Sequence, residues 1–340
     1  CYLGRYRIEP GPAIHLSATC RVVFATDMKA SPPVLVALKL MKHMLQFKAE
    51  VAARVVDGGR LPQSVVVELL AWHTAGQQLA DGLGQREESE PTPCPLHPEF
   101  DEYPNVLVLR QAERSLHDAC NKERMAGYNM PAIIEALRSI ADKLGQLHEA
   151  GVVHGDLKQR NIIRCDGELV LCDMDAAARI GAKIGGKTSS AYCPTELACV
   201  RFVPHDGGGE GATIVAAASF DVWSFGVIIY ELCAGRTLFA QDIANDELVD
   251  AADRTRLCSW LCISDEELAP VLAEAGVAEP QLVADARAAV DDGGGDARAV
   301  DELLGLVVDL GCELARRREN EAGRVDLAAA GVVVRGLDGA

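Results

Sequence analysis

The sequence lacks an apolar run long enough to cross a membrane. Its longest run lies at residues 222–232, which is about half the roughly 20 residues that a spanning helix needs, and Ser224 and Gly226 interrupt it. We therefore expect a buried helix there, with no membrane segment and no secretory signal peptide. The chain begins with Cys1 rather than Met, so we expect it to be part of a longer protein.

Basic residues are also scarce. The 33 Lys and Arg residues face 50 Asp and Glu residues, which gives a formal net charge of −17 and a pI near 4.9. Nucleic acids and anionic membranes are bound by clustered Lys and Arg. The composition therefore argues against a nucleic-acid partner and against a membrane surface.

No two cysteines have the CxxC spacing of a metal or redox pair, although the chain has twelve cysteines. Several of them lie inside apolar segments, where a thiol acts as a small hydrophobic side chain. This usage favours a reducing compartment and hence a cytoplasmic location.

The sequence does have enough apolar residues for a globular protein, with 49% hydrophobic and 24% charged residues. A single core stops growing near about 250–300 residues, so a chain of 340 residues predicts two lobes. We find no convincing internal repeat, and the sequence leaves the oligomeric state unknown.

The first third of the chain predicts mainly strands. Segments rich in β-branched residues predict strands at 21–27, 32–41, 64–72 and 105–109, with a helix at 47–56. Residues 74–102 lose this periodicity and collect Gly, Pro and acidic residues, which predicts a surface insertion.

Helices dominate the remainder. One face of a helix predicted at residues 131–150 carries Ile133, Leu137, Ile140, Leu144 and Leu147. Asn129 can cap this helix and Gly151 can end it. Residues 264–300 are rich in Ala, Asp and Glu and predict an acidic helical C-terminal part.

A dense polar cluster, HGDLKQRN at residues 154–161, lies between two apolar segments. The Asp-Gly pair at 166–167 then predicts a hairpin between strands at 162–165 and 168–172. In a hairpin about this two-residue turn, the numbers of two paired residues add to 333, as 166 and 167 do. Asn161 is therefore expected opposite Cys172 and next to Asp173. With Asp156 in the preceding loop, oxygen ligands and a base surround one point, as Mg²⁺ and phosphates require.

The ordered motifs resemble those of the eukaryotic protein kinase domain. VALK and FKAEV place Lys39 on a strand and Glu50 on a helix, HGDLKQRN resembles HRDLKxxN, and LCDMD stands where the family has DFG. The resemblance implies an α+β, bilobal protein kinase-like fold. A small β-rich N-lobe would span residues 1–110, including the insertion, and a larger helical C-lobe would span residues 111–340.

The resemblance also implies ATP and Mg²⁺ as cofactors. Lys39, paired with Glu50, would hold the α and β phosphates, and Asn161 and Asp173 would bind Mg²⁺.

The catalytic loop would supply the remaining groups. Asp156 would accept the proton of the substrate hydroxyl and Lys158 would steady the γ-phosphate. Lysine at position 158 favours a serine/threonine kinase over a tyrosine kinase.

Adenine would lie against the last strand of the N-lobe, by the same resemblance. Its apolar faces would rest on Val23, Ala37 and Ile163, and Leu109 would be the gatekeeper. The backbone of Arg110 to Ala112 would hydrogen-bond the base.

Two segments downstream resemble other kinase elements. SSAYCPTE resembles the end of the activation segment, with Glu196 a candidate partner for the arginines at 316–318, and Thr188, Ser189 and Ser190 are candidate autophosphorylation sites. Asp221 matches the residue that supports the catalytic loop from below.

The chain departs from the family at four places. Leu16, Ala18 and Arg21 stand where the glycine-rich loop has its glycines, so the loop cannot approach phosphate as closely, and Arg21 either intrudes or contacts phosphate. Gly155 replaces the arginine that receives a phosphorylated activation loop. Activity would then be constitutive or controlled elsewhere.

The other departures lie at the DFG motif and on the helix that carries Glu50. Met174 and Asp175 replace Phe and Gly. Met174 can fill the same apolar slot, while Asp175 loses the backbone freedom of glycine. Arg54 stands where the family has an apolar residue.

The preferred interpretation is phosphoryl transfer from Mg-ATP to Ser/Thr hydroxyls of protein substrates. One alternative is a pseudokinase, a binding or scaffold module, which the missing glycines motivate. Another is a small-molecule phosphotransferase of the aminoglycoside or choline kinase type, because HGDL and Asp-x-Asp also fit those enzymes.

Overall fold

The computed structural model describes residues 1–56, 59–74, 96–184, 187–202, 214–242 and 246–259. Two compact units are present. Unit 1 holds the described residues of 1–118, 143–188 and 214–221, and unit 2 holds those of 119–142, 189–202 and 222–259. The predicted acidic C-terminal part, residues 264–300, lies outside the described residues.

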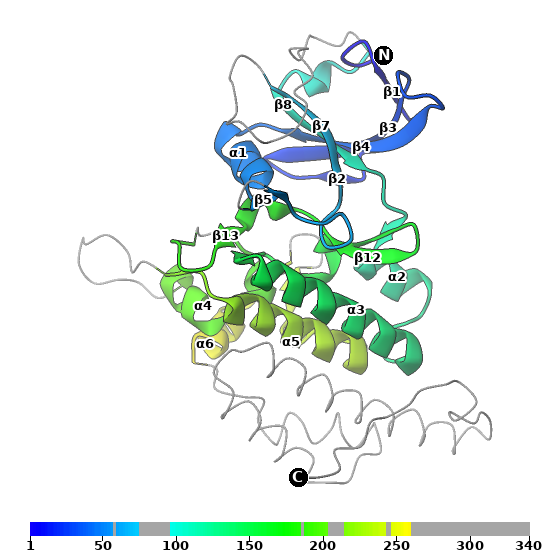
Figure 1. Cartoon of the computed structure of the whole chain (residues 1–340). Coiled ribbons are helices and arrows are strands. Elements are labelled where there is room, and N and C mark those ends of the chain that lie inside the picture. The colour runs from blue at the N-terminus through cyan, green and yellow to red at the C-terminus, as the bar shows by residue number, and fades with distance from the viewer. Residues whose placement is uncertain (57–58, 75–95, 185–186, 203–213, 243–245, 260–340) are drawn as a thin grey trace, which may run out of the picture. The chain divides into compact units, whose positions relative to one another are not determined.

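Unit 1 begins with an antiparallel sheet in the strand order β1-β3-β4-β8-β7, with β2 paired to β3 (Figure 1). Its strands are β1 (Tyr6–Ile8), β2 (His15–Leu16), β3 (Cys20–Asp27), β4 (Val34–Met41), β7 (Leu69–Thr74) and β8 (Asn105–Arg110). Side chains alternate between two faces of the sheet. One face packs in a cluster with Val36 and Leu38, and the other packs in a cluster with Ala37 and Leu109.

Helix α1 (Met44–Ala52) begins and ends earlier than the predicted range of 47–56. Strand β5 (Val55–Val56) takes the last predicted residues and pairs with β6 (Gly59–Arg60). A helix restricts χ1 of β-branched side chains, which fit a strand better. The prediction was therefore wrong at both ends, although α1 does bury Phe47, Glu50 and Val51.

The valines before β7 do not belong to the main sheet, so the strand predicted at 64–72 was wrong at its start. The N–H of Val67 donates to the carbonyl of Leu171 at 2.8 Å, and the N–H of Leu171 donates to the carbonyl of Val65 at 2.8 Å. These hydrogen bonds attach the valines to strand β12 (Glu168–Leu171) instead.

The predicted insertion at 74–102 is only partly described, because residues 75–95 lie outside the described residues. Its end is not a surface loop. Pro98–Phe100 forms the 3-10 helix η1, and the buried ring of Phe100 meets Tyr2 edge-on with ring centroids 5.3 Å apart.

The hairpin predicted around Asp166-Gly167 is confirmed. Strand β11 (Ile162–Cys165) pairs with β12, and Ile162 lies opposite Leu171, so the sum of 333 holds. Asp166 and Gly167 have φ values of +50° and +82°, as a type I′ turn requires.

Short strands complete unit 1. Strand β9 (Arg114–Ser115) lies on the other side of β11, and β10 (Val152–Val153) pairs with β13 (Ala178–Arg179). The N-terminal part of helix α2 (Leu116–Lys122) follows β9.

Helix α3 (Met130–Glu149) agrees with its prediction within one residue at each end. The side chain of Asn129 accepts a hydrogen bond from the N–H of Ala132 at 3.2 Å, and Gly151 follows the helix with φ of +72°. All five residues of the predicted face are buried, namely Ile133, Leu137, Ile140, Leu144 and Leu147.

Unit 2 is mainly helical. Its other elements are η4 (Ser190–Tyr192), α4 (Thr195–Phe202), most of α5 (Ala218–Ala234), β14 (Gln241–Asp242), β15 (Glu247–Leu248) and α6 (Ala251–Cys258). The hydroxyl of Tyr192 donates to Glu231 on α5 at 2.7 Å. The helix predicted at 222–232 lies within α5, and no helix among the described residues is long and apolar enough to cross a bilayer.

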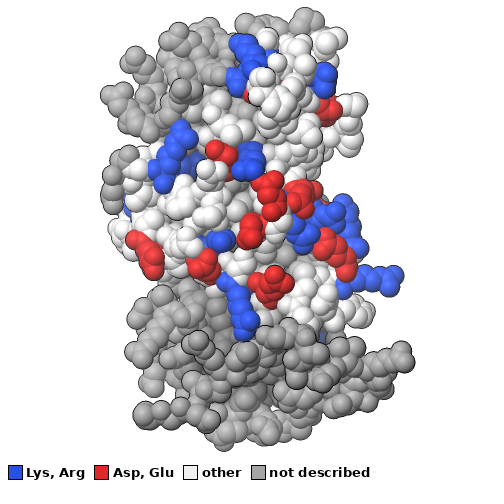
Figure 2. All heavy atoms as spheres, turned by 45° about the vertical axis from the view of Figure 1, so that its right-hand side comes forward, with Lys and Arg blue, Asp and Glu red and all other residues white. Residues whose placement is uncertain are grey.

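A β-rich first part followed by helices confirms the predicted α+β class. On the face shown in Figure 2, the acidic and basic side chains of the described residues lie interspersed with one another. Ion pairs among the described residues include Arg110 with Asp166 and Arg201 with Glu247.

Candidate active site

Lys39 of β4 is the centre of a buried charge cluster in unit 1. Its ammonium donates to Glu50 of α1 at 2.5 Å and to Asp173, which follows β12. Only 6% of the Lys39 side chain and none of the Glu50 side chain is exposed to solvent. The structure therefore brings together three residues that are up to 134 positions apart.

The protonation states follow from this packing. Burial favours the neutral form of Lys39, but the carboxylates of Asp173 and Glu50 outweigh it and raise the pKa of Lys39 well above its usual value. Burial likewise opposes ionisation of Asp173, but Lys39 and Lys187 hold the pKa of Asp173 well below its usual range. Lys39 is thus a cation and Asp173 an anion at neutral pH.

The loop HGDLKQRN brings Asp156, Lys158 and Asn161 together. The amide nitrogen of Asn161, in the 3-10 helix η2 (Gln159–Asn161), donates to the carbonyl of Asp156 at 2.8 Å and to its carboxylate at 3.4 Å. The ammonium of Lys158 lies 3.5 Å from the same carboxylate. These bonds use the amide nitrogen of Asn161 and not its amide oxygen, which can therefore serve as a ligand.

Asp221 holds this loop from α5. Its carboxylate accepts hydrogen bonds from the N–H groups of His154 at 2.7 Å and Gly155 at 2.9 Å, and it contacts the ring of His148 at 2.8 Å. Asp221 is fully buried, so each of its hydrogen bonds replaces water that the carboxylate has lost. The supporting position predicted for Asp221 agrees with this geometry.

Gly155 is sterically required. Its φ is +78°, and a Cβ atom there would lie 2.5 Å from the carbonyl oxygen of Ala176. The backbone after Asp173 therefore packs directly against the loop at this residue. The sequence indicated only that an arginine is missing, whereas the structure shows that no side chain fits.

Arg54 now has a physical explanation. Its guanidinium donates to the carbonyl of Glu50 at 2.8 Å and to the Glu50 carboxylate at 3.2 Å, and its side chain is 6% exposed. Glu50 thus lies between two cations, Lys39 and Arg54. The arginine replaces an apolar contact with a charged one that fixes Glu50 on α1.

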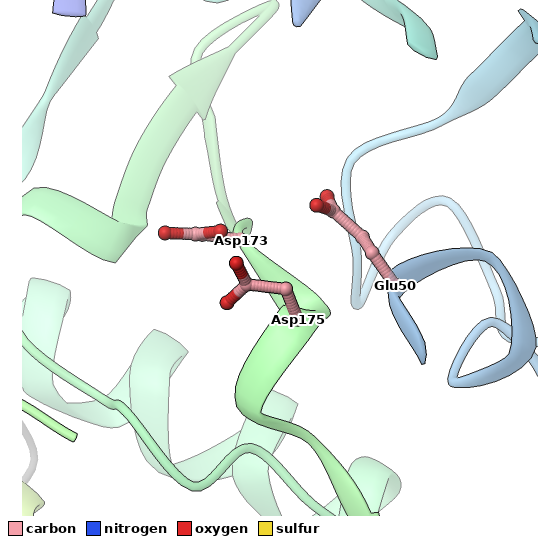
Figure 3. A group of neighbouring side chains, drawn as sticks. All are labelled: Glu50, Asp173 and Asp175. Carbon is pink, nitrogen blue, oxygen red and sulfur yellow. The ribbon is translucent and has the colours of Figure 1, made fainter. Parts of the chain in front are cut away.

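Three carboxylates come close together in this region (Figure 3). One oxygen each of Glu50, Asp173 and Asp175 lies within 4.8 Å of the others. Asp175 belongs to the 3-10 helix η3 (Met174–Ala176), which packs against α1. Burial, and then the charge of Asp173, raise the pKa of Asp175 to about 7.

The residues around Asp175 define the conformation of this segment. Met174 is fully buried, as expected for a side chain in the apolar slot of the family's phenylalanine. Asp173, not Asp175, has the left-handed backbone conformation, with φ of +63°. Such strain in a residue other than glycine costs about 1–2 kcal/mol and is common at functional sites.

The prediction for Val23 was wrong. Val23 packs on the sheet face with Val36 and Leu38, while its neighbour Val22 lies opposite Lys39 and packs with Ala37, Leu109, Ala112 and Ile163. Alternate side chains of a strand point to opposite faces, so an error of one residue moves the side chain across the sheet. Val22 is the valine on the face of the other predicted adenine contacts.

The backbone predicted to hydrogen-bond adenine, at residues 110–112, offers one donor fewer than expected. The N–H of Arg110 donates to the carbonyl of Glu68 at 3.0 Å, so it is not available to a base. The N–H of Arg110 is therefore removed from the backbone groups that the resemblance predicted for adenine. The side chain of Arg110 is 45% exposed and pairs with Asp166.

The turn between β2 and β3, where the family has its glycine-rich loop, uses backbone donors internally. The hydroxyl of Ser17 accepts hydrogen bonds from the N–H groups of Thr19 at 3.4 Å and Cys20 at 3.1 Å. Two backbone donors are thereby used inside the turn. Arg21 pairs with Glu99 at 3.2 Å on the sheet face opposite Val22, so neither alternative predicted for it describes its position.

The candidates in the activation segment are buried. Thr188, Ser189 and Ser190 are at most 8% exposed, and the Ser190 hydroxyl donates to Glu247 and accepts from the N–H of Leu248 at 2.7 Å. Ser190 is therefore unsuited as a phosphorylation site in this conformation. The partner predicted for Glu196, at residues 316–318, lies outside the described residues.

A cavity of about 250 Å³ lies beside the C-terminal end of α1. Its walls include Val51, Arg54 and Leu69. None of the site residues predicted for catalysis or for the metal lines it, so we assign it no part in the chemistry.

The order and geometry of these motifs agree with a comparison to known families. The model of the Protein kinase domain family matches residues 101–275, about half of the chain. The chain belongs to the protein kinase domain family. The α+β, bilobal protein kinase fold is thereby confirmed.

Several known kinases resemble this domain at low identity. An alignment over 204 residues, which covers 56% of the chain and 24% of the relative, shows 26% identity to ribosomal protein S6 kinase alpha-2 of Mus musculus. An alignment over 143 residues, which covers 41% of the chain and 21% of the relative, shows 32% identity to the probable serine/threonine-protein kinase CCRP1 of Zea mays.

A third relative is mitogen-activated protein kinase kinase 10 of Arabidopsis thaliana. It is 32% identical over an alignment of 137 residues, which covers 39% of this chain and 42% of that protein. Each of these matches spans less than half of the relative's length.

The contact at Gly155 predicts a specific loss of stability. Gly155→Ala should lower the free energy of unfolding by at least about 2 kcal/mol more than Gly151→Ala, because both glycines have positive φ but only Gly155 meets a backbone oxygen. Urea denaturation of the two variants measures the difference. Equal losses would contradict the steric explanation.

Arg54 predicts a second effect. Arg54→Leu restores the family's apolar residue but removes a charged partner from buried Glu50, so the free energy of unfolding should fall by about 1–3 kcal/mol. Arg54→Lys keeps the positive charge but cannot donate to both the carbonyl and the carboxylate of Glu50. Its free energy of unfolding should therefore lie between those of the wild type and Arg54→Leu. A variant Arg54→Leu as stable as the wild type in thermal and urea denaturation would show that Glu50 does not need Arg54.

Proposed function

We propose that this kinase domain transfers the γ-phosphoryl group of ATP to serine or threonine hydroxyls of protein substrates. The observation that carries the proposal is the position of the Lys39 ammonium between Glu50 and Asp173. A cation fixed at that point matches the charge of nucleotide phosphates. A lysine buried only for stability would not need two carboxylates from such distant parts of the chain.

The residues of the site fit a magnesium ion. Asp173 and Asn161 offer a carboxylate and an amide oxygen, which are the hard ligands that Mg²⁺ prefers. When bound, the ion would neutralise charge on the β and γ phosphates. Lys39 would orient the α and β phosphates while Glu50 and Arg54 keep its own position fixed.

Asp156 is the base in this proposal. Its carboxylate accepts a hydrogen bond from Asn161 and lies 3.5 Å from Lys158, so its position is fixed. The substrate hydroxyl oxygen forms a bond to the γ-phosphorus, and the bond from that phosphorus to the β,γ-bridging oxygen breaks. ADP leaves with that electron pair, and the hydroxyl proton goes to Asp156.

The class of substrate rests on two features. Lys158 lies beside Asp156, as the resemblance to serine/threonine kinases implies, and relatives in maize and other species bear the name serine/threonine-protein kinase. These features favour protein hydroxyls over the small molecules of aminoglycoside and choline kinases.

A second candidate is a binding module without phosphoryl transfer. The Ser17 hydroxyl occupies two backbone donors of the β2–β3 turn, which favours weak binding of phosphates. In that case Lys39 and Asp173 would neutralise each other permanently.

The test of the first candidate is transfer from radiolabelled ATP to casein. Asp156→Asn and Asp173→Asn should each reduce the rate at least about a hundredfold, since one loses the base and the other a charge at the phosphates. Asp142→Asn, an exposed aspartate on α3, is the matched control and should retain the wild-type rate.

A thermal-shift titration with Mg-ATP separates the two candidates. Stabilisation at millimolar nucleotide, together with transfer that depends on Asp156, supports the kinase. Neither stabilisation nor transfer in the wild type would contradict the kinase proposal and favour the binding module.

A further inference from the structure

Asp175 is a buried carboxylate that the proposed mechanism does not use. It stands two residues after Asp173, where the family has glycine. Its side chain is 4% exposed, and one of its oxygens lies within 4.8 Å of oxygens of both Asp173 and Glu50. Figure 3 shows Glu50 reaching from α1 toward the two aspartates of the segment after β12.

The three carboxylates do not have equivalent partners. Glu50 is held by Lys39 and Arg54, and Asp173 is held by Lys39, which is itself buried. Asp175 pairs with Lys187, whose side chain is 41% exposed. Lys187 is therefore the cation of the cluster that can most easily be released to water.

One oxygen of Asp175 has no hydrogen-bond partner. The Oδ1 atom is buried, and no described donor reaches it. A buried anionic oxygen without a partner costs about 1–3 kcal/mol or more. The ion pair with Lys187 does not satisfy Oδ1, because Lys187 donates to the other oxygen, Oδ2.

We propose that Asp175 is a second carboxylate ligand, with Asp173, of the divalent cation at this site, and that Lys187 occupies the cation's place when it is absent. The inference rests on the proposed function. A divalent cation would take oxygen ligands from both aspartates, including the unpartnered one. Glu50 is not assigned to the ion because its charge is already matched by two buried cations.

The inference makes Lys187 and the metal competitors for Asp175. Removing the carboxylate should weaken metal binding, whereas removing the lysine should strengthen it. A purely structural ion pair predicts no such opposite effects, since loss of either partner would leave metal binding unchanged.

The test is a titration of the purified domain with Mn²⁺, followed by electron paramagnetic resonance of the free ion. Asp175→Asn and Asp175→Gly should each weaken Mn²⁺ binding at least about tenfold. Lys187→Met should strengthen it severalfold. Lys183→Met removes an exposed lysine four positions earlier and should leave the affinity at the wild-type value.

Unchanged Mn²⁺ affinity in both Asp175 variants would overturn the inference, as would a wild type that binds no Mn²⁺ at millimolar concentration. Lys187→Met retains the carboxylates, so unchanged or weaker binding in that variant also contradicts the inference, even if the Asp175 variants fail to fold.

The transfer assay distinguishes this failure from failure of the proposed function. Transfer that continues while the affinity is independent of Asp175 removes only the metal role of Asp175. Binding that depends on Asp175 in a domain without transfer removes only the proposed kinase activity.

Discussion

The candidate active site depends on one buried ion pair, that of Lys39 with Glu50, and on the contact of the same ammonium with Asp173. Removing these charges from water costs several kcal/mol per ion unless each finds a partner. Lys39 lies in the middle of a sheet, Glu50 on the helix beside it and Asp173 after a distant hairpin. The pair therefore ties three local structures to one point, and Arg54, which follows the C-terminal end of α1, adds a fourth contact by holding Glu50.

A second constraint fixes the position of the loop at residues 154–161. Asp221 accepts two backbone N–H groups of the loop, and Gly155 lets the backbone at Ala176 approach to a distance that no side chain permits. The loop with the proposed base and the segment after Asp173 are thus packed against each other by main-chain contacts. The glycine that stands in place of the family's arginine permits this close packing.

Much of this arrangement was predictable because it depends on the spacing of apolar residues and on the register of a hairpin about a two-residue turn. The register of the β11–β12 hairpin, in which the numbers of paired residues add to 333, predicts that Asn161 lies beside Asp173. The spacing of apolar residues predicts the position of α3. The sheet face on which a side chain lies was harder to predict, because the adjacent residues Val22 and Val23 lie on opposite faces of the sheet. The predicted C-terminal end of α1 was wrong because Val55 and Val56 continue the apolar pattern of the helix but form a strand. The roles of Arg54 and Ser17 depend on contacts that no sequence pattern encodes, whereas the repeated aspartate of LCDMD was a signal for Asp175.

The central claim, that Glu50 acts through Lys39 on the nucleotide, is tested most directly by a double-mutant cycle. Mg-ATP affinity would be measured for the wild type, Lys39→Met, Glu50→Gln and the double variant, with thermal denaturation to check folding. The account predicts a coupling of about 1–3 kcal/mol, because Glu50→Gln should matter little once Lys39 is gone. Additive effects of the two substitutions would contradict it.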